Sequence, residues 1–258
     1  MAMYDNAQIV QTSFDGTFLS EYLLQAQWAE LVELKKIITE VADHQQAPVS
    51  ILDIGIGNAR IPRHLCGITE IWDRIARYDG TDNAQACVEL ARREIEQLQI
   101  HKKVSVSLFD ATHLGTWGRR YDLVITTWFT AGNFYPEDFP FDGYQAAGHK
   151  LNLETNEKFT TIFHSAYGLL HPGGEIVIGS CYIDNESTRQ KQEASYKKMG
   201  LTIITDAHDA FTATKEGFWS QRFTQDKLVR YLPFVDPANI SFTPLDTYEY
   251  AMQVRIRK

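Results

Sequence analysis

Three aspartates follow three successive β-rich segments of the chain, and their spacing predicts a ligand site. Asp82 lies about one βαβ unit after Asp53, and Asp110 follows the next such segment. A carboxylate at the end of a strand can accept hydrogen bonds from both hydroxyls of a ribose, which suits Asp82, and Asp110 could accept one from an adenine amino group. Asp79 competes with Asp82, but the spacing after Gly80 favours Asp82. Together the three aspartates indicate a nucleoside-binding site.

Two glycines, Gly55 and Gly57, come directly after the first of these segments. Without a Cβ atom they allow a sharp turn and a close approach of the backbone to a ligand. The dinucleotide fingerprint G-x-G-x-x-G needs a glycine where this chain has Arg60, which argues against a nicotinamide cofactor. Asp53 beside this loop would repel a pyrophosphate and suits a cationic ligand. Its alternative role is to cap the helix that follows.

The elements that would position these residues alternate between strands and helices. Apolar residues recur at helical spacing over 18–41, before Pro48, and the chain then changes to short β-rich runs separated by helical ones. The expected strands are 49–54, 75–78, 104–109, 121–127 and 175–180. The expected helices between them include 84–97 and 158–170. At the C-terminal end we expect a helix over 224–232 and strands over 240–243 and 248–257. This order predicts an α/β fold: a mostly parallel sheet of seven strands, helices on both faces, and an antiparallel C-terminal edge strand. In such sheets ligands bind beyond the carboxyl ends of the strands.

Composition excludes several other classes of protein. The chain has 258 residues and a net charge of −8, which disfavours a nucleic-acid partner because phosphate binding requires clustered cations. Cys66, Cys87 and Cys181 form no C-x-x-C pair, so we expect reduced thiols and neither a disulfide framework nor a metal site. No long apolar run or signal sequence is visible, and we expect a single cytoplasmic domain with no membrane partner. Aromatic residues make up 12% of the chain, which is a surplus for a core of this size.

Five segments together resemble the class I S-adenosylmethionine-dependent methyltransferases: ILDIGIGNARIP, YDGTDNA, LFDATHL, YDLVITTW and LLHPGGEIVIGS. They occur in that family's order, over residues 49–180. The resemblance implies a Rossmann-like fold and S-adenosyl-L-methionine as the cofactor, whose cationic sulfonium agrees with the acidic first loop. It implies these cofactor-binding residues: Asp53, Gly55, Gly57, Asn58, Asp82, Asn83, Asp110, Ala111 and Thr127. One departure is Ala59, where the family often has a third glycine.

The segment after the fourth expected strand would face the methyl group in that family. Gly132-Asn133-Phe134 resembles the Gly-Asn loop of the glycine and glycine/sarcosine N-methyltransferases, and the Gly-Asn-aromatic-x-Pro-Glu stretch of the histidine N-methyltransferases of the ergothioneine pathway. The resemblance implies that Asn133 contacts an amino group of the acceptor, and Tyr135 or Glu137 could accept its proton. A turn-forming Gly-Asn pair is the alternative interpretation.

Two segments exceed the minimal fold and carry much of the aromatic surplus. We expect a division into an N-terminal helical lid (1–48), a cofactor-binding core (49–181), substrate-cap segments (133–157 and 182–222), and a terminal helix with two strands (223–258). The second cap segment would contain a helix 184–199 and a hairpin of 201–206 with 210–214. Aromatic faces can hold an amine by cation–π attraction, although they could equally pack the cap onto the sheet. The substrate-binding candidates are Trp128, Asn133, Phe134, Tyr22 and Trp219.

These features rank the possible reactions. N-methylation of an amino acid or small amine comes first, and O-methylation of a small natural product comes second. A phenol or carboxyl acceptor would call for a histidine base, for which His149 and His164 are the candidates, although His164 falls in a helix. A protein acceptor comes third. A non-catalytic protein that binds S-adenosylmethionine is the alternative from another class, and the oligomeric state stays open.

Overall fold

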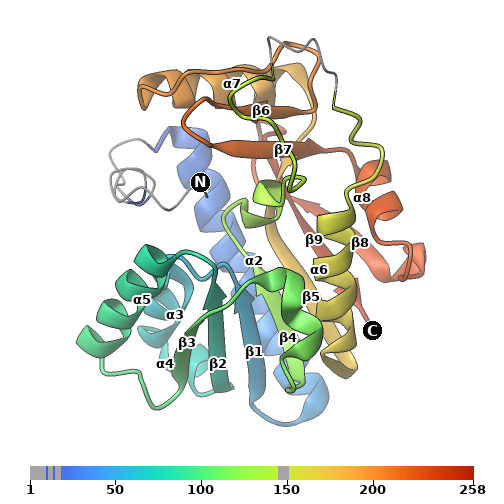
Figure 1. The fold of residues 1–258 in the computed structure, drawn as a ribbon. Coiled ribbons are helices and arrows are strands. Elements are labelled where there is room, and N and C mark those ends of the chain that lie inside the picture. Colours follow the sequence, from blue (N-terminus) through green and yellow to red (C-terminus); the bar gives the residue numbers. More distant parts are fainter. Residues whose placement is uncertain (1–9, 11–13, 15–18, 145–150) are drawn as a thin grey trace.

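Nine strands form one β-sheet in the part of the chain that the computed structural model describes, residues 10, 14, 19–144 and 151–258 (Figure 1). The strands are β1 (Val49–Ile54), β2 (Ile75–Asp82), β3 (Val104–Leu108), β4 (Tyr121–Thr126), β5 (Leu170–Ile183), β6 (Phe211–Ala213), β7 (Trp219–Phe223), β8 (Ile240–Pro244) and β9 (Ala251–Arg257). The helices are α2 (Glu21–Gln45), α3 (Arg60–Cys66), α4 (Thr69–Trp72), α5 (Gln85–Gln97), α6 (Glu157–Gly168), α7 (Glu186–Lys198) and α8 (Gln225–Tyr231). Short 3₁₀ helices are η3 (Ala111–Thr116), η4 (Thr130–Asn133) and η5 (Pro237–Asn239).

The main sheet has the strand order β3-β2-β1-β4-β5-β9-β8. Strands β1 to β5 pair in parallel, whereas β9 runs antiparallel to both of its neighbours. The predicted mostly parallel α/β sheet with an antiparallel C-terminal strand is therefore confirmed. The prediction that this last strand forms the edge is wrong, because Ile256 pairs with Ile176 of β5 on one side and Ile240 of β8 on the other. Most of β9 is buried, as an interior strand should be, and β8 is largely exposed at the edge.

Alternate residues of the strands face two separate hydrophobic layers. In β4, Val124 packs in the layer that contains α6 and α8, and Leu123 and Ile125 pack in the layer that contains α2, α3 and α5. This alternation follows from the pleat of a strand, and burial on both faces explains why the strands read as continuous apolar runs. The two layers confirm the expected helices on both faces and fix the carboxyl ends of the strands on one side of the molecule.

The first long helix belongs mainly to the core. The sequence predicts a helix over 18–41, and α2 begins at Glu21 and ends at Gln45, where Gln46 takes a left-handed φ of 54°. Leu34, Ile38 and Val41 are buried against the sheet. Residues 1–9, 11–13 and 15–18 of the expected lid lie outside the described residues.

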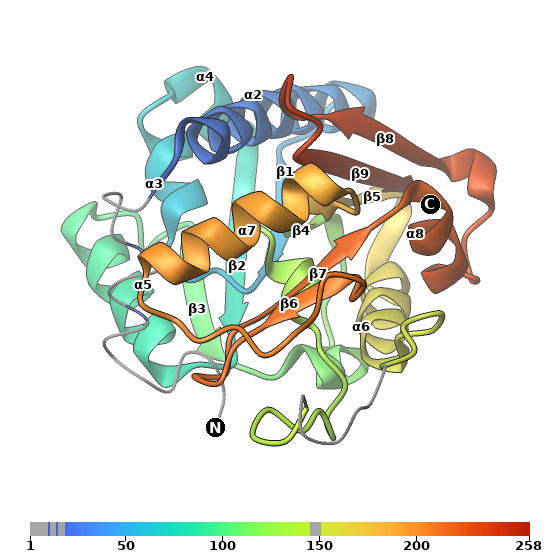
Figure 2. The same cartoon turned by 90° about the horizontal axis from the view of Figure 1, so that it is seen from above.

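A cap covers the carboxyl ends of the strands. Helix α7 and the β6–β7 hairpin lie across this end of the molecule in the view from above (Figure 2). Strand β7 joins the sheet by pairing Arg222 with Tyr182, near the end of β5 and past the last residue of β4 that pairs with β5. The helix expected over 184–199 is confirmed as α7. The expected hairpin of 201–206 with 210–214 is reduced to one antiparallel bridge, Ile203–Thr214, and a hydrogen bond from the Ala213 N–H to the Thr205 hydroxyl. The ladder of the hairpin pairs β6 with β7.

Candidate active site

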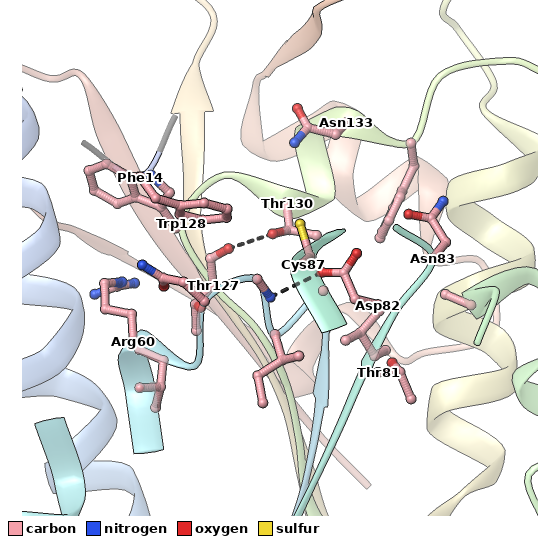
Figure 3. A pocket seen from close by; sticks show the side chains of 18 of the residues that line it. Phe14, Arg60, Thr81, Asp82, Asn83, Cys87, Thr127, Trp128, Thr130 and Asn133 are labelled. Atoms are coloured by element: carbon pink, nitrogen blue, oxygen red, sulfur yellow. Dashed lines mark hydrogen bonds between the residues drawn. The ribbon is translucent and has the colours of Figure 1, made fainter. Parts of the chain in front are cut away.

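A cavity of about 390 Å³ lies at the carboxyl ends of β1, β2 and β4, beneath the cap (Figure 3). This volume lies within the range of small-molecule binding sites. Of the residues that the sequence singles out, thirteen line this cavity: Gly55, Gly57, Asn58, Asp82, Asn83, Asp110, Ala111, Thr127, Trp128, Asn133, Phe134, Tyr135 and Trp219. Asp53 and Tyr22 do not line it. Residues that are far apart in the sequence are thus brought together at one edge of the sheet.

The loop after β1 is built on left-handed backbone conformations. Gly55 and Gly57 have φ values of +77° and +57°, which glycine adopts without steric cost. Ala59 also has a positive φ, +58°, so the position where the resembling family often has a glycine is one that glycine suits better. A Cβ atom at Gly57 would lie 3.0 Å from the ring of Phe14, another residue of the cavity wall. The left-handed φ values of Gly55, Gly57 and Ala59 therefore determine the path of the loop along the cavity.

Asp82 ends β2 and points its carboxylate toward the cavity (Figure 3). Its Oδ2 accepts the backbone N–H of Gly57 at 3.0 Å, and its Oδ1 accepts that of Ala84 at 3.0 Å. Burial raises the pKa of Asp82, and these N–H donors oppose that rise. The backbone N–H of Asn83 also acts on this carboxylate, whose two oxygens have four lone pairs in all, so acceptor capacity remains for a ligand. Asp82 is thereby fixed in orientation with hydrogen-bonding capacity to spare.

Asp110 caps η3 at the other end of the cavity floor. Its Oδ1 accepts the backbone N–H of Thr112 at 2.9 Å and the Thr112 hydroxyl at 2.8 Å. Burial would raise the pKa of Asp110, but the hydrogen bonds from Thr112 and the nearby charges of Lys158 and His113 hold that pKa below its ordinary value. Ala111 follows immediately and lines the same part of the cavity. Asp110 is thus an ionised acceptor at the cavity edge.

Asp53 lies below the glycine loop and is almost completely buried. The Tyr78 hydroxyl donates a hydrogen bond to its Oδ2 at 2.6 Å, and its Oδ1 has no hydrogen-bond partner. Burial raises the pKa of Asp53 to about 7, against the lowering effects of the Tyr78 hydrogen bond and of Arg60. Asp53 does not line the cavity, and its carboxylate is engaged by Tyr78 of β2 and not by the cavity.

A buried carboxylate from the N-terminal helix holds the loop after β4. Oε1 of Glu30 accepts the backbone N–H of Trp128 at 2.8 Å and the Ser180 hydroxyl at 2.7 Å, and Oε2 pairs with Arg60. Trp128 and Phe129 both have left-handed φ values, +53° and +62°. Such conformations are costly for bulky residues and persist where the surroundings impose them. The Arg60 guanidinium also lies 5.4 Å from the Trp128 ring, so Glu30 and Arg60 together shape this wall.

The chain segment that carries Asn133 packs closely against the cap. A Cβ atom at Gly132 would lie 3.1 Å from the backbone oxygen of Gln221 in β7, which explains a glycine before Asn133. The Tyr196 hydroxyl donates to the Ser220 hydroxyl at 2.6 Å, and Ser220 in turn donates to Oδ1 of Asn133 at 3.5 Å. The amide nitrogen of Asn133 faces the cavity (Figure 3). Asn133 therefore presents a hydrogen-bond donor there.

Tyr22 lies outside the cavity and joins α2 to the cap. Its hydroxyl lies 3.3 Å from the Ser195 hydroxyl of α7, and its ring centroid lies 4.7 Å from that of Tyr250. By contrast Trp219 is fully buried, lines the cavity and stacks on Phe211 with 4.0 Å between ring centroids. Among the histidine candidates, His164 packs against Phe234 away from the cavity, and His149 lies outside the described residues.

Sequence reasoning missed several polar residues of this site, among them Glu30, Arg60 and Lys158. Glu30 sits on the apolar face of α2, four residues from both Ala26 and Leu34, and an acidic residue within that stripe is a signal of a buried partner. Arg60 stands where the dinucleotide fingerprint has glycine. No local sequence pattern indicates that its side chain lines the cavity. Lys158 lines the cavity from the first turn of α6. In the part of the chain that the structure describes, no cluster of three potential metal ligands occurs, and no helix is long and apolar enough to cross a membrane.

The fold of this chain is similar to that of solved methyltransferase structures. No protein-family model and no curated protein sequence matches the chain. Solved structures of methyltransferases do match it along most of its length, at low sequence identity. One is the CcbJ methyltransferase from Streptomyces caelestis, with 12% identity, 99% of this chain and 98% of that chain covered, and a TM-score of 0.60.

Two further structures extend this likeness. The magnesium protoporphyrin IX methyltransferase from Synechocystis PCC 6803, with bound SAH, has 11% identity, 97% and 93% coverage of the two chains and a TM-score of 0.57. The 1,6-didemethyltoxoflavin-N1-methyltransferase from Burkholderia thailandensis, with bound 1,6-didemethyltoxoflavin and S-adenosylhomocysteine, has 14% identity, 91% and 78% coverage and a TM-score of 0.51. At these identities the likeness establishes the fold, and function must be argued from the site.

Proposed function

We propose that this protein transfers a methyl group from S-adenosyl-L-methionine to the nitrogen of a small molecule. The observation that carries the proposal is Asp82, whose carboxylate is fixed by backbone N–H groups beside the glycine loop and keeps acceptor capacity toward the cavity. That arrangement fits the paired hydroxyls of a ribose. Asp110 and Ala111 would border the adenine, and Gly55, Gly57 and Asn58 the methionine part, with Asn83 and Thr127 completing the wall.

The size of the cavity and its two carboxylates support this cofactor. Its floor carries the carboxylates Asp82 and Asp110, and Arg60 approaches it from α3. Asp53 is buried outside the cavity lining and accepts a hydrogen bond from Tyr78, so it would make no direct contact with the cofactor. When bound, the cofactor would supply an electrophilic methyl group next to a neutral leaving group.

The residues of this chain would contribute alignment and proton handling. Trp128, Phe134 and Trp219 form an apolar wall that excludes water, and the Asn133 amide can orient the acceptor nitrogen by its carbonyl or its N–H. Correct alignment contributes up to about 7–11 kcal/mol in well-oriented reactions. Tyr135, also in the wall, is the candidate to accept or relay the proton that the nitrogen loses.

A nitrogen acceptor is favoured over an oxygen acceptor by the composition of the wall. Among the described residues, no histidine lines the cavity, so the base that a phenol or carboxyl acceptor would call for is missing from this part of the chain. An amine in its neutral form carries its own lone pair and requires only removal of a proton after transfer.

The experiment that tests the proposal compares cofactor binding by Asp82→Ala and by a matched surface variant, Asp73→Ala. Loss of two ribose hydrogen bonds should weaken S-adenosylhomocysteine binding by about 1–3 kcal/mol, and Asp73→Ala should bind as the unmodified protein does. Equal affinities of the two variants would remove Asp82 from the site. Binding without any turnover across a panel of amino acids and amines would favour a non-catalytic binding protein.

A further inference from the structure

The cavity has two ends of different chemistry. Its carboxylates, Asp82 and Asp110, both belong to the floor formed by the strand ends. At the other end, beneath the cap, the polar groups of the described lining are the Asn133 amide, the Tyr135 hydroxyl and the Lys158 ammonium. This end therefore offers hydrogen-bond donors and a positive charge, and Asp110 at the floor is the carboxylate of the lining on which the Lys158 charge acts.

The N-cap residue of α6 positions Lys158 at the end of the cavity beneath the cap. Asn156 is the N-cap of α6, and its Oδ1 accepts the backbone N–H of Phe159 at 3.0 Å. Its amide nitrogen donates to the backbone oxygen of Phe134 at 2.9 Å and to the side chain of Gln221 at 3.1 Å. One buried side chain thus ties the first turn of α6 to the loop that carries Asn133 and to β7. The Lys158 ammonium consequently lies 5.0 Å from the centre of the Tyr135 ring.

Lys158 differs from the other cations that line the cavity in its partners. Arg60 is paired with Glu30, and Arg63 lies 3.8 Å from Glu94. Among the described residues Lys158 forms no ion pair within 4.0 Å: its charge acts on Asp110 from farther away and helps to lower the pKa of that carboxyl, and its ammonium lies over the face of Tyr135. A half-buried ammonium beside an aromatic wall is better stabilised when an anion joins it, because burial has removed part of its hydration.

We infer that the acceptor carries a carboxylate, which Lys158 binds while the apolar part of the acceptor packs on the aromatic wall. This inference rests on the proposed function and narrows it to amino acids and related acids, in place of simple amines. A free amine would bring a positive charge toward Lys158 without a carboxylate to receive it. In an amino acid, the carboxylate pairs with Lys158 and the nitrogen can lie near Asn133.

Three probes of nearly equal shape test the inference: 3-phenylpropanoate, phenethylamine and 3-phenylpropanamide. Each is titrated calorimetrically into the protein saturated with S-adenosylhomocysteine. We expect the carboxylate to bind about tenfold or more tighter than the amine, as one charge-assisted hydrogen bond would give. In Lys158→Met and Lys158→Gln this preference should disappear while S-adenosylhomocysteine affinity is retained. Lys36→Met, at an exposed pair with Glu33, serves as the matched control and should keep the preference.

Three results would overturn the inference: equal or tighter binding of the amine, no binding of any probe, or a preference that survives in both Lys158 variants. The affinity for S-adenosylhomocysteine is measured separately in the unmodified protein. If that ligand does not bind, the proposed function fails, and the probes are then titrated into the free protein so that the pairing with Lys158 is still judged by itself.

Discussion

The carboxylate of Glu30 accepts the backbone N–H of Trp128, across 98 residues of sequence, at a distance of 2.8 Å. The bond joins the N-terminal helix α2 to the wall of the cavity at a residue whose φ is left-handed. Because Glu30 is fully buried and also pairs with Arg60, it fixes two residues that line the cavity at once. The conformation of the site therefore depends on a helix outside the segment that carries the methyltransferase-like motifs.

Glu30→Gln should lower the free energy of unfolding strongly. The amide can still accept a hydrogen bond from Trp128, but Arg60 loses its counter-charge in a largely buried position. Leaving one partner of a buried ion pair uncompensated costs about 3–5 kcal/mol. Urea denaturation measures the change, and Glu33→Gln, in an exposed pair with Lys36 on the same helix, should cost less than about 1 kcal/mol. Equal effects of the two variants would show that the buried pair contributes little.

Gly179→Ala tests the same carboxylate from the strand side. A Cβ atom at position 179 would collide with Oε1 of Glu30, which is held by Trp128 and Ser180 and cannot swing away freely. We expect a loss of about 1–3 kcal/mol in unfolding free energy. Gly168→Ala, where the new atom meets nothing within 4 Å, is the control. The loss should shrink when Gly179→Ala is combined with Glu30→Ala, and strict additivity would contradict the collision.

Asp53→Asn should change how stability depends on pH. Burial raises the pKa of Asp53 from 3.8 to about 7, so the folded state holds its proton more tightly than the unfolded state. The contribution of Asp53 to the free energy of unfolding is therefore complete below pH 3.8. It falls as the pH rises toward 7, by at most about 1.4 kcal/mol per pH unit. The amide variant lacks this loss and can still accept the Tyr78 hydroxyl.

Unfolding free energies of the two proteins at pH 5 and pH 8 measure this effect. The stability of Asp53→Asn relative to the unmodified protein should be higher at pH 8 than at pH 5. A difference that is the same at both values would mean that Asp53 titrates near its ordinary pKa in the folded protein.

Gly132→Ala tests the contact between the Asn133 segment and the cap. The added atom would lie 3.1 Å from the backbone oxygen of Gln221, and neither backbone can move without displacing η4 or β7. We expect a loss of about 1–3 kcal/mol in unfolding free energy. Gly115→Ala, whose new atom would meet only the Ser165 hydroxyl at 3.7 Å, should cost less. Indistinguishable midpoints in urea would mean that the glycine is required only for its turn.

Features that depend on residues close together in the sequence were predictable. Asp82 and the glycines of the first loop lie within one βαβ unit, where local spacing and strand period already determine that they meet. The alternation of strands and helices likewise predicted the mostly parallel sheet. These predictions succeeded because each depended on residues close together in the chain.

Features that depend on distant contacts were not predictable in the same way. The place of β9 inside the sheet follows from pairing with β5 and β8, and Tyr22 meets α7 through a partner far along the chain. The prediction put the hairpin too early in the chain. Residues 201–206 are of types that are common in strands, but they form one isolated bridge and no strand. Glu30 was passed over because an acidic residue in a helix usually faces solvent.

The most direct test of S-adenosylmethionine binding in this cavity is a calorimetric titration of S-adenosylmethionine and S-adenosylhomocysteine into the unmodified protein. We expect both ligands to bind at a single site per chain, with contacts that depend on Asp82. Absence of binding by both ligands would contradict this expectation.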